Sequence, residues 1–237
     1  MNRFFATLAW LCVGHAAVFG LFWLLLQVPE SNAWMLATSA LIVAAGVILL
    51  GVVDASAILS LRSIDPMSAA VRSGLRRGWL VVFPLAVFGC LWWLTGAASS
   101  WLSRHAGEMD AWIIAKTGWT ATAGLHAALG WIIAFVRYGV GASLAITWMG
   151  QLASRGVAGL VSNWIRDGFA WTRLLVVSVA LLIGIWLPWQ AVYWRPASLP
   201  ATWIEPAFAA IKLLVLFVVA NVAWAVVLRS VPRRTAS

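Results

Sequence analysis

Long apolar runs dominate this chain, and short polar segments separate them. Six runs reach the roughly 20 residues that a helix needs to cross the hydrocarbon core of a bilayer. Their apolar positions are continuous rather than alternating, which favours helices over the strands of a membrane barrel. The pattern therefore predicts an all-α polytopic membrane helix bundle that forms a single integral membrane domain over residues 1–237. The six predicted transmembrane helices lie at residues 4–27, 34–61, 78–101, 119–152, 171–191 and 204–229.

Composition agrees with a membrane location. Hydrophobic residues make up 63% of the chain and charged residues 10%, with a mean hydropathy of +0.94. A soluble domain is about half apolar and about a quarter charged, so a soluble enzyme and a disordered chain are both excluded. The net charge of +9 would suggest a nucleic-acid partner in a soluble protein. Here the basic residues lie between apolar runs, so we interpret them as topology signals and expect no nucleic acid.

The distribution of basic residues predicts an orientation. Three of them, at positions 104, 116 and 195, fall on one side of the predicted membrane. Cytoplasmic loops are enriched in Lys and Arg, so we expect a bacterial-type inner membrane protein with both termini cytoplasmic. The first run exceeds the 7–15 residues of a signal-peptide core and is expected to stay as a helix. Eleven basic residues fall on the other, cytoplasmic side: Arg3, Arg62, Arg72, Arg76, Arg77, Arg155, Arg166, Arg173, Arg229, Arg233 and Arg234.

The two longer cytoplasmic linkers, residues 65–79 and 157–169, resemble each other at an offset of 90 positions. Each is predicted to form a short amphipathic elbow helix lying in the membrane interface. The likeness indicates a parallel internal repeat with units 34–101 and 119–191. The basic residues Arg72, Arg76, Arg77 and Arg166 are expected to contact anionic lipid headgroups. The matched pairs are Val71 with Val161, Leu75 with Ile165, Arg76 with Arg166, Gly78 with Gly168 and Trp79 with Phe169.

Charges inside the predicted spans are expensive and mark candidate sites. Asp54 and Arg137 lie in the second and fourth spans. Under the repeat they are seven residues apart in depth, about 10 Å, so a buried ion pair between them is feasible. Such a pair would be either a substrate or proton site at the repeat interface or a contact that fixes helix register. Lys212, in the last span, would either extend to the membrane surface or line a cavity.

Uncharged polar residues within the spans are further candidates. Asn221 is expected to hydrogen-bond another helix, and His126 is expected to be satisfied within the bundle. A b-type haem between His15 and His126 would require similar depths, but their estimated depths differ by about 7 Å. The 18 Trp residues form either an interfacial belt or a ligand cage. The segment 102–118 is expected to be a separate helix on the outer surface.

Catalytic motifs are missing from the sequence: it contains no HExxH, GxSxG or Walker loop and no paired carboxylates within one span. His105, Glu108 and Asp110 could form a metal or hydrolytic site. Three polar residues within one exposed loop are more typical of a solvated loop, which is the interpretation we favour. We therefore expect no enzyme activity and no cofactor.

The pattern Ala-x-x-x-Gly-x-x-x-Gly-Trp, formed by Ala70, Gly74, Gly78 and Trp79, resembles bacterial six-helix proteins of the YciC-like kind. It also resembles the membrane domain attached to some glycerophosphodiester phosphodiesterases. The resemblance implies a fold and carries over no catalytic residue. The sequence thus favours a membrane scaffold, an assembly subunit or a lipid-interacting module. The alternatives are a small transporter or channel using Asp54, Arg137 and Lys212, and a lipid-modifying enzyme. Expected partners are the lipid bilayer, anionic headgroups and other membrane subunits or further copies of this chain.

Overall fold

The computed structural model describes residues 2–29, 32–62, 66–120, 122–194 and 204–231, and all secondary structure in these residues is helical. The long helices of the first half are α1 (Asn2–Leu25), α2 (Ala33–Arg62) and α3 (Met67–Thr117). The second half continues through α4 (Thr122–Ala134), η1 (Phe135–Gly141), α5 (Ala142–Arg155), η2 (Gly156–Val161), α6 (Trp164–Gly168), α7 (Trp171–Leu181), η3 (Leu182–Trp186), α8 (Leu187–Tyr193) and α9 (Ile204–Arg229).

Six helical stretches of the described residues are long and apolar enough to cross a membrane, which confirms the predicted number. Each corresponds to one predicted run, and the last one coincides with it. The agreement follows because helix formation satisfies every backbone hydrogen bond within one segment, as a lipid environment demands. These stretches are Arg3–Leu25, Ala33–Arg62, Met67–Thr117, Thr122–Val161, Trp171–Tyr193 and Ile204–Arg229.

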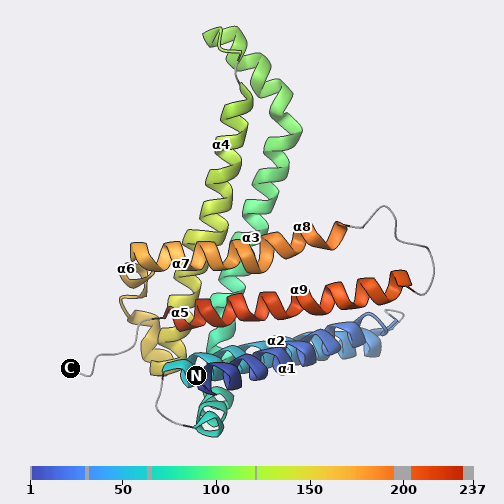
Figure 1. The fold of residues 1–237 in the computed structure, drawn as a ribbon, viewed down its shortest axis with the longest axis vertical. Helices are drawn as coiled ribbons and strands as arrows, with labels where there is room; N and C mark the ends of the chain where they lie inside the picture. The colour runs from blue at the N-terminus through green and yellow to red at the C-terminus, as the bar shows by residue number, and fades with distance from the viewer. Residues whose placement is uncertain (1, 30–31, 63–65, 121, 195–203, 232–237) are drawn as a thin grey trace.

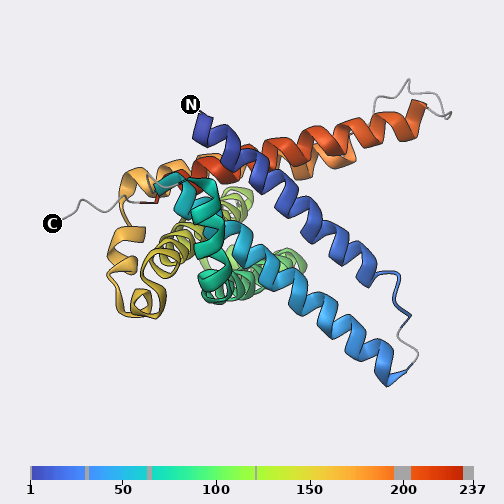
Figure 2. The ribbon, with the colours of Figure 1, turned by 90° about the horizontal axis from the view of Figure 1, so that it is seen from below.

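The helices form three hairpins that diverge from one shared packed end (Figures 1 and 2). The hairpins are α1 with α2, α3 with α4, and α7–α8 with α9. We call their shared end the hub. It contains the start of α1, the end of α2, the start of α3, α5, the start of α7 and the end of α9. Its fully buried side chains include Leu11, Val53, Ile58, Val81, Ile146, Met149, Leu181, Val227 and Leu228.

Small residues bring α2 and α3 into close contact at the hub. A Cβ atom added to Gly78 would lie 2.6 Å from the Cα atom of Val52, and one added to Gly74 would lie 3.1 Å from the backbone nitrogen of Ser56. Ala70 is also buried. Small residues allow helix backbones to approach closely in membranes, where van der Waals packing drives association. The pattern of residues 70–78 is therefore a packing surface for α2.

The first predicted elbow is wrong, because residues 67–79 belong to the uninterrupted helix α3. The segment 102–118 is likewise not a separate surface helix, since α3 continues through it to Thr117. At 51 residues, α3 is roughly 75 Å long at 1.5 Å per residue. The residue after its end, Gly118, has a φ of 69° and donates a backbone N–H hydrogen bond to the Ile114 carbonyl, which forms a left-handed C-terminal cap. Sequence patterning failed here because an amphipathic segment and a continuing helix have the same 3.6-residue period.

The second linker does contain short helical segments, η2 and α6. Gly168 at its end packs against the preceding helix: an added Cβ would lie 3.2 Å from the Cα atom of Leu144. Gly78, its partner in the proposed repeat, packs against α2 in a comparable way. This shared packing is what such a repeat requires, although the internal repeat itself stays a prediction.

Candidate functional site

A buried polar cluster joins the first two helices to the last one, which is far from them in sequence. His15 comes from α1, Asp54 from α2, and Asn221 with Trp224 from α9. Asn221 and Trp224 are three residues apart, so they project from the same face of their helix. Asp54 and Asn221 are 1% and 3% exposed, and the His15 side chain is 16% exposed. These polar groups therefore lie away from solvent and depend on one another for hydrogen bonds.

The hydrogen bonds of the cluster place one proton of His15 on its Nδ1. The Asn221 amide Nδ2 donates to the Phe217 carbonyl at 2.9 Å, which leaves its Oδ1 as the acceptor facing His15. His15 Nδ1 lies 2.7 Å from that oxygen, so it carries a proton. The other imidazole nitrogen, Nε2, therefore faces Asp54 Oδ1 at 3.6 Å. Trp224 Nε1 donates to the same carboxylate oxygen at 2.8 Å.

His15 and Asp54 form a unit that is neutral when it holds one proton between them. The proton resides either on His15 Nε2, giving an ion pair, or on Asp54, giving a neutral acid beside a neutral imidazole. Either arrangement avoids an isolated buried charge, which would be far more costly than a paired one. A histidine that faces a carboxylate inside a membrane span is typical of functional positions.

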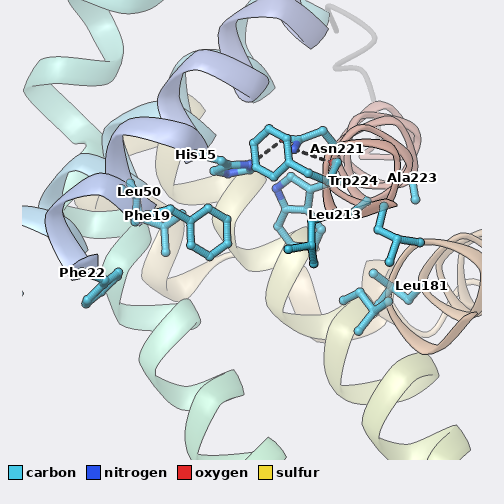
Figure 3. Close-up of a pocket in the computed structure, with 14 residues that line it drawn as sticks. His15, Phe19, Phe22, Leu50, Leu181, Leu213, Asn221, Ala223 and Trp224 are labelled. Atoms are coloured by element: carbon cyan, nitrogen blue, oxygen red, sulfur yellow. Dashed lines mark hydrogen bonds between the residues drawn. The ribbon is translucent and has the colours of Figure 1, made fainter. Parts of the chain in front are cut away.

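An apolar crevice of about 750 Å³ adjoins this cluster (Figure 3). It lies among α1, α2, the α7–η3 segment and α9, where two of the hairpins diverge. His15, Asn221 and Trp224 line one part of it. None of the described residues that line it is Lys, Arg, Asp or Glu. Its apolar wall is formed by Val18, Phe19, Phe22, Leu50, Leu181, Ile185, Leu213, Leu216, Phe217, Ala220 and Ala223.

Asp54 and Arg137, whose pairing the sequence made feasible, have different partners in the structure. Arg137 lies in η1 and donates from Nε to the Thr95 hydroxyl of α3 at 2.9 Å. Its guanidinium carbon lies 4.9 Å from the ring centre of Trp92 and 6.0 Å from that of Tyr138, so aromatic faces take the place of a carboxylate. The repeat register placed Asp54 and Arg137 at compatible depths, but the divergence of the hairpins gives them different neighbours.

Lys212 and His126 also lie apart from the cluster. The Lys212 ammonium donates to the carbonyls of Val192 and Trp194, at 2.7 and 3.0 Å. It thus caps the C-terminal end of α8, where a cation is favoured, and it does not line the crevice. His126 Nε2 lies 2.6 Å from Asp110 Oδ1, which joins α4 to the far end of α3. One imidazole nitrogen of His126 therefore meets a carboxylate that was expected in a solvated loop, whereas the other, Nδ1, is buried without a hydrogen-bond partner among the described residues.

The four arginines predicted to contact headgroups divide into two groups. Arg72, Arg76 and Arg166 are exposed, which leaves them free to meet a membrane surface. Arg77 is half-buried and donates to the carbonyls of Ala153 and Ser154, at 3.1 and 2.7 Å. Arg77 therefore contacts the C-terminal end of α5, and its headgroup contact stays a prediction. This contact could not be read from the sequence because the acceptors are backbone atoms.

Sequence reasoning missed the cluster as a unit. Asn221 was expected to bond another helix, and its contact with α1 confirms that expectation. His15 was considered as a haem ligand, and Trp224 was one of many interfacial Trp residues. The sequence did show a polar residue within each of the three apolar spans. It did not show that the three residues meet, because that depends on how the spans pack together.

No group of three or more His, Cys, Asp or Glu side chains in the described parts of the chain is arranged to hold a metal ion. Comparison of the chain with protein-family models, with curated proteins and with solved structures gives no match.

Proposed function

We propose that this protein is a non-catalytic, lipid-interacting membrane module that accepts one apolar lipid chain in the crevice between its α1–α2 hairpin and the hairpin of α7–α8 with α9. The observation that carries the proposal is the apolar crevice of about 750 Å³. An apolar void within a bilayer does not fill with water, so lipid chains are its natural occupants. Ligand pockets of 300–1,000 Å³ with mostly apolar walls and few polar groups are typical binding sites.

The proposal places the hub on the cytoplasmic side of a bacterial-type inner membrane. Its support is the concentration of basic residues at this end, including Arg62, Arg77, Arg155, Arg173 and Arg229. Both the start of α1 and the end of α9 lie at the hub (Figure 1). Exposed Arg72, Arg76 and Arg166 would contact anionic headgroups there. A reporter fused to either end and active in the cytoplasm would support this orientation.

We also propose membership of the YciC-like group that the residues 70–79 resemble. The support is that Ala70, Gly74 and Gly78 are buried and that the two glycines pack directly on α2. Small residues that serve a close backbone contact between two helices would be a feature of the fold that this chain shares with that group. The surface of the diverging hairpins is also the place where another membrane subunit or a second copy would attach.

The lipid proposal is tested by filling the crevice. Ala220 lines it and Leu214, six residues earlier on α9, does not. Leu214 is 63% exposed. We expect Ala220→Phe protein, purified in mild detergent, to lose the lipid that native mass spectrometry finds on the wild type, while Leu214→Phe keeps it. Equal lipid retention by the two variants would overturn the proposal.

A second candidate, transport coupled to protons, is favoured by the buried pair of His15 and Asp54. This differs from a path lined by Asp54, Arg137 and Lys212, which have separate surroundings. Proteoliposomes with an internal pH dye would distinguish the candidates. A proton flux above that of empty liposomes, abolished by Asp54→Asn, would favour transport over the lipid-interacting module.

A further inference from the structure

The crevice has a polar end whose chemistry restricts what a bound lipid can carry. We propose, resting on the proposed function, that it selects a neutral lipid with a free hydroxyl group, such as a diacylglycerol, over lipids with an anionic headgroup. The hydroxyl would lie against His15 and Asn221, and the acyl chain would lie along the apolar wall. The inference follows from the charges and the unfilled hydrogen-bonding positions at this end.

Charge is the first restriction. The described lining residues contain no Lys or Arg that could pair with a phosphate or a carboxylate. Asp54 lies directly behind His15 and Trp224, and accepts a hydrogen bond from the latter. An anionic headgroup would have to give up its water and approach this carboxylate. The only positive charge that could offset the repulsion is a proton on His15. Both effects raise the cost of binding an anion.

Hydrogen-bonding capacity is the second restriction. Asn221 Oδ1 accepts from His15 Nδ1 and keeps a second lone pair. The 3.6 Å between His15 Nε2 and Asp54 Oδ1 exceeds the roughly 2.7–3.2 Å of an N–H···O hydrogen bond. Asp54 is 1% exposed and does not line the crevice, so a ligand oxygen there can reach only the imidazole of His15, which does line it. A hydroxyl both donates and accepts, so it fits this imidazole whether or not Nε2 holds a proton.

Wall shape is the third restriction. Phe19 of α1 and Phe217 of α9 meet edge to face, with ring centres 5.9 Å apart. Both line the crevice together with Phe22. Apolar and aromatic side chains therefore continue away from the polar end, as Figure 3 shows. A ligand with one small polar group at the end of a long apolar chain matches this sequence of surfaces.

The test is photolabelling of the full-length protein in nanodiscs with a diacylglycerol that carries a photoreactive acyl chain. Three unlabelled competitors with the same acyl chains differ in one group each: the diacylglycerol, its O-methyl ether and the phosphatidic acid. We expect labelling on α1 and α9. We also expect the diacylglycerol to compete at least about 10-fold better than the other two, since one net hydrogen bond of about 1.4 kcal/mol corresponds to that factor.

Variants separate this inference from the proposed function. Ala220→Phe should abolish labelling, and His15→Leu should retain labelling but lose the preference among competitors. Equal competition by all three lipids in the wild type would overturn the hydroxyl inference and leave the lipid module standing. Labelling that is unchanged in Ala220→Phe would overturn both. Because the competitor series uses the wild type, the hydroxyl inference stays falsifiable even when His15→Leu does not fold.

Discussion

The contact between His15 and Asp54 yields a quantitative prediction for a double-mutant cycle. His15 Nε2 and Asp54 Oδ1 are 3.6 Å apart, and Asp54 is 1% exposed. For unit charges at that distance and an effective dielectric constant of about 20, Coulomb's law gives about 4–5 kcal/mol, which is an upper limit. A neutral hydrogen bond between membrane helices averages about 0.6 kcal/mol and reaches about 1.7 kcal/mol.

We therefore expect His15→Leu and Asp54→Leu each to lower the free energy of unfolding by about 3 kcal/mol, because each removes one of the two partners of a buried polar group. The double variant should be more stable than the sum of the two losses predicts, by about 1–3 kcal/mol. The assay is reversible unfolding in mixed SDS micelles followed by circular dichroism. A coupling above about 1.7 kcal/mol would indicate the ion pair, and a smaller one the neutral form.

The matched control pairs Asp54→Leu with Arg137→Leu. Asp54 interacts with His15 and Trp224, whereas Arg137 interacts with Thr95 and aromatic rings. Without shared partners, their losses should add within about 0.5 kcal/mol. Additive losses for His15 and Asp54 would refute the paired site, and strong coupling of Asp54 to Arg137 would restore the pairing that the sequence suggested.

Three further predictions concern packing and helix ends. Gly78→Ala should cost about 1–3 kcal/mol of unfolding free energy because the new methyl group meets the α2 backbone. In the same helix, the methyl group of Gly89→Ala meets nothing within 4 Å, so this control should be neutral or stabilising. Equal effects of the two changes would contradict the close α2–α3 contact. Arg77→Met should lower stability by about 1.5–3 kcal/mol through its lost bonds to α5, whereas Arg76→Met should stay within about 0.5 kcal/mol in the same unfolding assay. Lys212→Met should speed hydrogen exchange of the α8 amides, and unchanged exchange would argue against its capping role.

The amount that could be predicted differs between the fold and the site. The last span, Ile204–Arg229, was placed to the residue, because apolar length alone defines a membrane helix. The start of α3 was misplaced, because residues 67–79 have an amphipathic pattern that fits both an interfacial helix and a continuing one. Asp54 was identified as an unusual intramembrane charge, yet the repeat register suggested Arg137 as a feasible partner in place of His15 and Trp224.

The sequence by itself determined that the helices suit a lipid bilayer, how many of them could span it, and which polar residues lie within those spans. These features depend on local composition and on the thickness of a bilayer. The tertiary structure decided which of those polar residues meet. His15 and Asn221 are 206 positions apart and become neighbours because α1 packs beside α9 at the hub. The crevice is likewise a property of the arrangement, since it exists where two hairpins diverge. Contacts between helices depend on crossing geometry and close backbone approach, and neither is encoded in the apolar period of a single helix.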